Sequence, residues 1–150
     1  MSLNDGRQMT QTILSASAVA IGDVALAIEG PPGCGKSSLA LALIDRGARL
    51  IGDDGVSITN DNDRLIAGPP PNIEGMVELR GIGLFQMPLS RPRPLSLILS
   101  LAVHGERLPE SIPQRDIQGV LIPCLPFEPG TLAPAVRAEM ALTKHGLQFQ

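Results

Sequence analysis

The chain contains very few aromatic residues. Three phenylalanines make up the whole aromatic content of 2%, and the 150 residues include neither tryptophan nor tyrosine. Proteins that bind single-stranded nucleic acids stack the bases on aromatic side chains, so this composition argues against such a platform. The charge balance agrees, because 12 lysines and arginines against 15 aspartates and glutamates leave a formal net charge of −3. We therefore expect no nucleic-acid partner.

Cysteines and long apolar runs are also scarce. Two cysteines, Cys34 and Cys124, do not make a disulfide framework in a chain of this length. No apolar run approaches the roughly 20 residues of a membrane span, and the polar N-terminus has no signal-peptide pattern. We expect a cytoplasmic protein with no membrane partner. A hydrophobic content of 43% with 18% charged residues predicts a globular chain.

What the chain does contain is a glycine-rich stretch at residues 30–38 that matches G-x-x-x-x-G-K-[ST]. An apolar run at residues 24–28 predicts a buried strand before it, and residues 36–46 are strong helix formers. A strand, a glycine-rich turn and a helix present backbone N–H groups to phosphates. We expect Lys36 to reach the β and γ phosphates and Ser37 to bind Mg²⁺. The predicted nucleotide-binding residues are Gly30, Pro31, Pro32, Gly33, Cys34, Gly35, Lys36, Ser37 and Ser38.

Two adjacent carboxylates, Asp53 and Asp54, follow a short predicted strand at residues 49–52. Open α/β sheets bind ligands beyond the carboxyl ends of their strands. Successive residues of an extended chain point to opposite faces, so the two carboxylates cannot do the same work. We expect one to face the nucleotide and the other to brace the loop. Asp-Asp-Gly is also turn chemistry, but the neighbouring phosphate loop favours a functional interpretation.

A third informative stretch, residues 76–85, combines alternating apolar residues with two charges and two glycines. The alternation places Glu78 and Arg80 on the same face of a strand, where we expect them to pair on a solvated surface. Alternatively, Glu78 adds a carboxylate to a metal site, and Gly81 and Gly83 allow close approach of the backbone.

The rest of the chain predicts more strands and one helix. We expect strands at residues 13–21, 56–59, 64–67, 95–103 and 117–122, and a helix at residues 132–145. Residues 13–21 and 24–28 should form a hairpin, and residues 56–59 and 64–67 a second one around residues 60–63. Residues 95–103 should be central. The prediction is an α/β fold with a P-loop-containing central mixed sheet, the phosphate loop at its edge and flanking helices. It forms one domain at residues 13–150, after a tail at residues 1–12 that can stem in part from cloning.

Three of these stretches together resemble the C-terminal catalytic domain of HPr kinase/phosphorylase, the bacterial serine kinase of the phosphotransferase system. They are residues 30–37, 43–54 and 77–83, and the last looks like the signature of that family. The resemblance covers about residues 15–125. It implies an HPr kinase/PEP carboxykinase-like fold, a truncated form without the N-terminal domain, and a homo-oligomer, because family members assemble as hexamers.

The resemblance also implies an activity, an ATP-dependent protein serine kinase that phosphorylates HPr or an HPr-like phosphocarrier, with ATP and Mg²⁺ as cofactors. Lys36 then binds the transferred phosphates, and Asp54 matches the acid/base residue of the family. Ser37 and Glu78 match its metal-linked residues. Arg107, in Glu-Arg-Leu-Pro, lies about where the family has a functional arginine. Asp53 and Arg80 are expected to support the site.

The sequence departs from the family at two places. Ser15 occupies the position of a family histidine that is implicated in catalysis and regulation, and Thr131 stands where an arginine is more usual. The phosphorylase direction therefore stays open. Two further hypotheses also stay open, which are a kinase of the same fold with a small-molecule substrate and a catalytically weak module that senses ATP.

Overall fold

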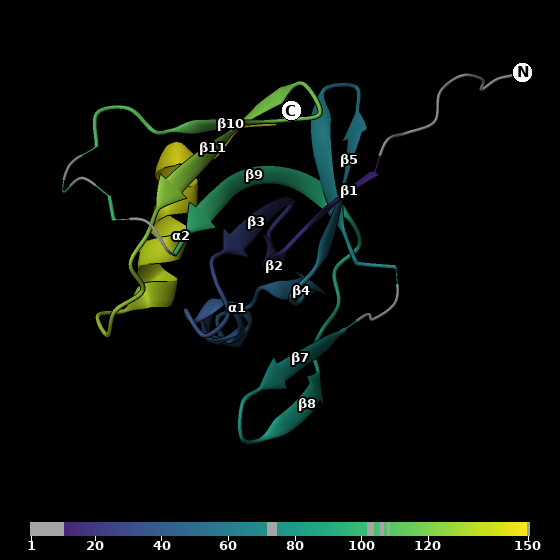
Figure 1. The fold of residues 1–150 in the computed structure, drawn as a ribbon, viewed down its shortest axis with the longest axis vertical. Helices are drawn as coiled ribbons and strands as arrows, with labels where there is room; N and C mark the ends of the chain where they lie inside the picture. Colours follow the sequence, from purple (N-terminus) through teal and green to yellow (C-terminus); the bar gives the residue numbers. More distant parts are fainter. Residues whose placement is uncertain (1–10, 72–74, 102–103, 106, 108, 150) are drawn as a thin grey trace, which may run out of the picture.

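The computed structural model describes residues 11–71, 75–101, 104–105, 107 and 109–149 (Figure 1). Its elements in chain order are β1 (Gln11–Leu14), β2 (Ala16–Ile21), β3 (Val24–Glu29), α1 (Lys36–Asp45), β4 (Arg49–Gly52), β5 (Val56–Asp61), β6 (Arg64–Gly68), β7 (Met76–Leu79), β8 (Gly83–Gln86), β9 (Arg93–Ser100), β10 (Gln114–Ile117), β11 (Val120–Pro126) and α2 (Pro134–His145). Within the described residues, no helix is long and apolar enough to cross a membrane.

A mixed sheet of nine strands forms the centre of the fold. Seven strands follow the order β1-β5-β6-β9-β3-β2-β4, and the β10–β11 hairpin joins them through β11 and β9. Strand β9 pairs in parallel with β3 and β11, and its first residues, Arg93 and Pro94, pair antiparallel with β6. Its curved path in Figure 1 carries it from one part of the curled sheet to the other. These pairings confirm the mixed α/β fold and the central place of this strand.

Both helices pack on one face of the sheet (Figure 1). Leu39 and Leu43 of α1 share a buried cluster with Ile28 of β3 and with Ala138 of α2. The opposite face buries a second cluster, in which small alanines of β2 and β3 meet larger side chains such as Ile58 of β5. Strand β3 lies between β9 and β2, so the phosphate loop leaves an interior strand, not the edge of the sheet as expected. Pairing on both sides fixes the point from which the loop starts.

The strand expected at residues 13–21 is two strands. Strand β1 begins at Gln11 and pairs with β5, whereas β2 pairs with β3 and β4, and the exposed Ser15 separates them. The chain thus changes partners at Ser15, which places β1 and β2 in different parts of the curled sheet. The hairpin between β2 and β3 is confirmed, since Ile21 pairs with Val24 across the turn.

The single strand expected at residues 117–122 is also wrong. Gln118 and Gly119 form a two-residue turn with φ angles of 52° and 83°, which joins β10 to β11. Two side chains hold this turn. The carboxylate of Asp116 accepts the N–H of Gly119 at 2.8 Å, and Gln118 Nε2 donates to Thr12 Oγ1 at 2.8 Å. The Gln-Gly pair, which lies between apolar residues, therefore forms a hairpin turn and divides the expected strand into two.

Residues 76–85 form a hairpin of their own, β7 and β8, which extends away from the main sheet (Figure 1). Arg80 lies in its turn, and the two described side chains of Glu78 and Arg80 form no ion pair, so the predicted pairing on one strand face is wrong. The hairpin of β5 and β6 and the helix α2 are confirmed. The turn between β5 and β6 is only Asn62-Asp63, with φ angles of 54° and 64°.

Candidate functional site

The glycine-rich loop runs from the end of β3 to the start of α1. Gly33 and Gly35 have φ angles of 83° and 102°, which glycine adopts without the steric cost of a Cβ. Gly35 is the N-cap of α1 and provides no side-chain cap. The first N–H groups of a helix have no partner within the helix, so this end of α1 offers donors to an anion.

Lys36 is the first residue of α1 and is only 8% exposed. Its ammonium donates a hydrogen bond to the carbonyl of Gly30 at 2.7 Å, so it closes the loop on itself. A Cβ at Gly30 would lie 2.5 Å from Cys34 Sγ, which explains the glycine at this position. Because an ammonium has three protons, Lys36 can keep this bond and still donate to a phosphate.

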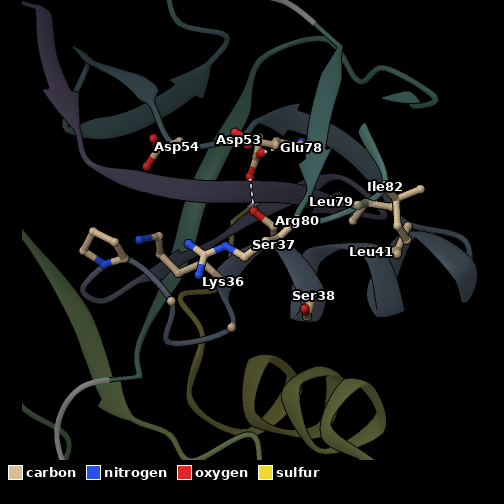
Figure 2. Close-up of a pocket in the computed structure, with 13 residues that line it drawn as sticks. Lys36, Ser37, Ser38, Leu41, Asp53, Asp54, Glu78, Leu79, Arg80 and Ile82 are labelled. Atoms are coloured by element: carbon tan, nitrogen blue, oxygen red, sulfur yellow. Dashed lines mark hydrogen bonds between the residues drawn. The ribbon is translucent and has the colours of Figure 1, made fainter. Parts of the chain in front are cut away.

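Asp53, at the end of β4, joins three parts of the chain. Its Oδ1 accepts hydrogen bonds from Ser37 Oγ of the loop and from Ser17 Oγ of β2, both at 2.8 Å. Its Oδ2 accepts the backbone N–H of Glu78 at 3.2 Å, which ties β7 to the same carboxylate. Figure 2 shows Asp53 directed at Ser37. Asp53 is therefore the residue that braces the loop.

Asp54 is placed differently from its neighbour. It has a φ angle of 60°, a left-handed conformation that aspartate tolerates better than most residues. Its backbone N–H lies 3.5 Å from Ser17 Oγ, while its exposed carboxylate accepts no hydrogen bond from any described residue. The two adjacent carboxylates thus divide into a bonded one and a free one, as expected, but the left-handed bend at Asp54, not strand alternation, separates them.

These groups line one cleft of about 520 Å³ (Figure 2). The phosphate loop and α1 form one wall and the β7–β8 hairpin forms the other, with the Asp53 and Asp54 carboxylates between them. In Figure 2 the Arg80 guanidinium extends from the hairpin back over the cleft. The lining residues are Pro32, Gly33, Gly35, Lys36, Ser37, Ser38, Leu41, Asp53, Asp54, Glu78, Leu79, Arg80 and Ile82.

Four of the predicted site residues lie outside this cleft. Gly30, Pro31 and Cys34 belong to the loop but do not line it. Cys34 instead faces Gly30 and contributes to a second pocket of about 320 Å³, which includes Pro129. Arg107 is exposed and is not among the lining residues, so its functional role stays a prediction.

The sequence interpretation missed Ser17 and the apolar wall of the cleft. Ser17 is completely buried in β2 and lies opposite Ile28, two residues before the loop. A hydroxyl inside an otherwise apolar strand was the available signal, because a buried polar group needs a hydrogen-bond partner. The apolar lining consists of Leu41 of α1 and of Leu79 and Ile82 of the hairpin, and the sequence pattern gave no signal that these two elements would face one another.

The side chains of the cleft that could bind a metal ion offer hard oxygen atoms as ligands. The Ser37 hydroxyl and the carboxylates of Asp53, Asp54 and Glu78 all face it, and Mg²⁺ prefers such ligands. In the part of the chain that is described, no three His, Cys, Asp or Glu residues are grouped so that they could hold a metal ion by themselves. A site for Mg²⁺ here would therefore combine protein oxygens with those of a bound nucleotide.

A loop of this kind between a buried strand and a helix, with carboxylates after the next strand along the chain, defines an α/β domain of the phosphate-loop class. The family of the HPr serine kinase C-terminal domain matches residues 7–90, which is more than half of the chain. The chain belongs to this family. The resemblance to that family is therefore confirmed.

Relatives with known names agree with this assignment. The chain is 38% identical over 84 residues to HPr kinase/phosphorylase of Enterococcus faecalis, and 38% identical over 88 residues to that of Clostridium tetani. The matches cover 55% and 59% of this chain but only 27% and 29% of those proteins. The solved structure of the Hpr(Ser) kinase/phosphatase from Coxiella burnetii matches with a TM-score of 0.73 and 27% identity, over 88% of this chain and 89% of that one.

Proposed function

We propose that the chain binds ATP with Mg²⁺ and transfers the γ-phosphoryl group to a serine of an HPr-like phosphocarrier protein. The observation that carries the proposal is the bonded path from Ser37 through Asp53 to Glu78. It connects the phosphate loop, the end of β4 and the signature hairpin within one cleft. The names of the relatives, which are HPr kinases, support a carrier-protein serine as the acceptor.

In this proposal the loop binds the phosphates. The free N–H groups at the start of α1 donate to the phosphate oxygens, and Lys36 adds a positive charge. Phosphoryl transfer depends mainly on position and charge neutralisation, so a loop already closed by the bond between Lys36 and Gly30 is well prepared. Arg80 lines the cleft and adds a second positive charge near the phosphates.

The residues that would hold Mg²⁺ are Ser37, Asp53 and Glu78, which all line the cleft. A hydroxyl and one or two carboxylates, together with phosphate oxygens and water, satisfy the usual preference of this ion. Bound with ATP, Mg²⁺ would neutralise part of the charge on the phosphates. Asp53 would orient the Ser37 hydroxyl through the hydrogen bond of 2.8 Å that it already accepts.

Asp54 is the proposed acid/base residue. Both oxygens of Asp53 already accept hydrogen bonds from the protein, whereas the Asp54 carboxylate is free to accept one from a substrate hydroxyl. As the serine oxygen attacks the γ phosphorus, the bond to the leaving ADP breaks and the serine proton passes to Asp54. The products are phosphoserine and ADP.

The test is incubation of the chain with γ-labelled ATP, Mg²⁺ and a candidate HPr-type protein. We expect label on a single serine, and at least a hundredfold slower labelling by Asp54→Asn. Asp61→Asn, at the exposed end of β5, is the matched control and should label at the wild-type rate. Equal rates for Asp54→Asn and Asp61→Asn would contradict the role of Asp54.

The alternatives differ in what they label. If MgATP binds but no carrier protein is labelled, the protein-kinase proposal fails, and a screen of small hydroxyl compounds tests the small-molecule kinase. A chain that binds MgATP and labels nothing would be the ATP-sensing module. The reverse reaction needs a separate test, because Ser15 occupies the position of the family histidine. In that test, phosphoserine-HPr and phosphate are supplied as substrates. We further propose a cytoplasmic homo-oligomer, by similarity to the family.

A further inference from the structure

A second charged cluster lies at the base of the phosphate loop. Glu29 is the last residue of β3 and directly precedes Gly30, where the loop begins. Arg115 of β10 binds its carboxylate through two hydrogen bonds, from Nη1 to Oε1 at 2.6 Å and from Nη2 to Oε2. Such a paired contact is the strongest form of arginine–carboxylate interaction. The two side chains are only 19% and 38% exposed, so solvent screens the pair less than a surface pair.

Cys124 of β11 is the third member of the cluster. Its Sγ lies 3.4 Å from Arg115 Nη2 and 3.8 Å from Glu29 Oε2. Burial raises the pKa of the Cys124 thiol, so the thiol is neutral at neutral pH. The hydrogen bond to Glu29 is the main cause that raises the pKa of Arg115. The cluster therefore holds one negative charge, on Glu29, and one positive charge, on Arg115, and the two neutralise each other.

The position of Glu29 creates an electrostatic problem for a phosphate site. Its Cα lies about 3.8 Å from that of Gly30, whose carbonyl holds the Lys36 ammonium at 2.7 Å. A nucleotide bound on the loop would bring several negative charges to a segment that begins one residue after Glu29. Like charges repel strongly where burial lowers the effective dielectric constant. An unpaired Glu29 would therefore oppose the binding of phosphates.

We propose that Arg115 is a positioning residue for nucleotide binding, which neutralises Glu29 and fixes the base of the phosphate loop to the β10–β11 hairpin. The inference rests on the proposed function, because it requires that the loop binds a nucleotide. It adds a residue from a hairpin that does not line the cleft.

The test is titration of the chain with MgADP by calorimetry at low and high salt. Arg115→Met leaves Glu29 unpaired, so the Kd should rise about tenfold at low salt and less at high salt. Adding Glu29→Gln to this variant should restore the Kd to within about twofold of wild type. If Arg115 had a purely structural role, the double variant would not regain its affinity for MgADP, since it also lacks the ion pair.

The matched control is Arg46→Met, which breaks the exposed pair of Arg46 with Glu139 and removes the same charge elsewhere. It should leave the Kd unchanged. The inference is overturned if Arg115→Met binds like wild type, or if the double variant binds as weakly as Arg115→Met. If Arg115→Met does not fold, the single variant Glu29→Gln is the test. It should bind MgADP at least as tightly as wild type, and a higher Kd would contradict the inference. A wild-type chain that binds no MgADP would overturn the proposed function and this inference together.

Discussion

Removal of the Asp53 carboxylate should cost about 2–4 kcal/mol in free energy of unfolding. Asp53 accepts hydrogen bonds from Ser17, from Ser37 and from the backbone of Glu78. Ser17 is completely buried, so its hydroxyl left without an acceptor costs about 1–3 kcal/mol. Ser37 and Glu78 reach solvent and can bond to water, so the loss of their bonds adds only about 1 kcal/mol. For a chain of this length the sum lowers the Tm by roughly 5–15 °C.

The assay is urea and thermal unfolding of Asp53→Ala, followed by circular dichroism because the chain has no tryptophan. Asp54→Asn is the matched control, since its carboxylate has no bond to lose and asparagine tolerates the φ angle of 60°. It should stay within about 0.5 kcal/mol of wild type. The double variant Ser17→Ala/Asp53→Ala should be more stable than Asp53→Ala by about 1 kcal/mol, because no hydroxyl is left unsatisfied. Equal stability of Asp53→Ala and Asp54→Asn would refute the bracing role of Asp53.

Two further predictions concern the loop and the cluster behind it. Gly35→Ala should lose about 1–2 kcal/mol of stability, because its φ angle is 102°, and should bind MgADP at least tenfold more weakly. Gly47→Ala, with a φ of 111° at the other end of α1, should lose similar stability but keep its affinity in the same calorimetry. Burial raises the pKa of Cys124 in the folded state. The thiol therefore contributes its full share to the stability of the fold below the ordinary thiol pKa, and this share is lost as the pH rises through the folded-state pKa. In urea unfolding, wild type should therefore lose more stability than Cys124→Ala between pH 7.5 and an alkaline pH near 10, and parallel losses would contradict this.

The phosphate loop could be predicted because its signals are local. The apolar run before it, the glycines at fixed spacing and the helix formers after it all lie within residues 24–46. The two hairpins around Gly22-Asp23 and Asn62-Asp63 were predictable for the same reason, since turn residues interrupt two apolar runs. Asp53 and Asp54 were expected to act differently, but alternation alone could not say which of the two braces the loop. The left-handed turn at Asp54 decides this.

The parts that could not be predicted depend on partners far away in the sequence. Ser17 meets Asp53 across 36 residues, and Arg115 meets Glu29 across 86. Ser15 looked like the middle of a single strand, because apolar residues continue on both sides. Only the pairing of β1 with β5, and of β2 with β3, shows that the chain changes partners there.

The central position of β9 has a consequence for how the chain can fold. Its partners β3, β6 and β11 come from residues 24–29, 64–68 and 120–126, so the strand closes the sheet through contacts between distant parts of the sequence. The match to the family ends at residue 90, three residues before this strand begins. A fragment that stops there keeps every residue of the proposed phosphate and metal site but loses the strand that pairs with both β3 and β6. During synthesis, the loop should therefore acquire its shape only after β9 has been made, and such non-local pairing is typically slow.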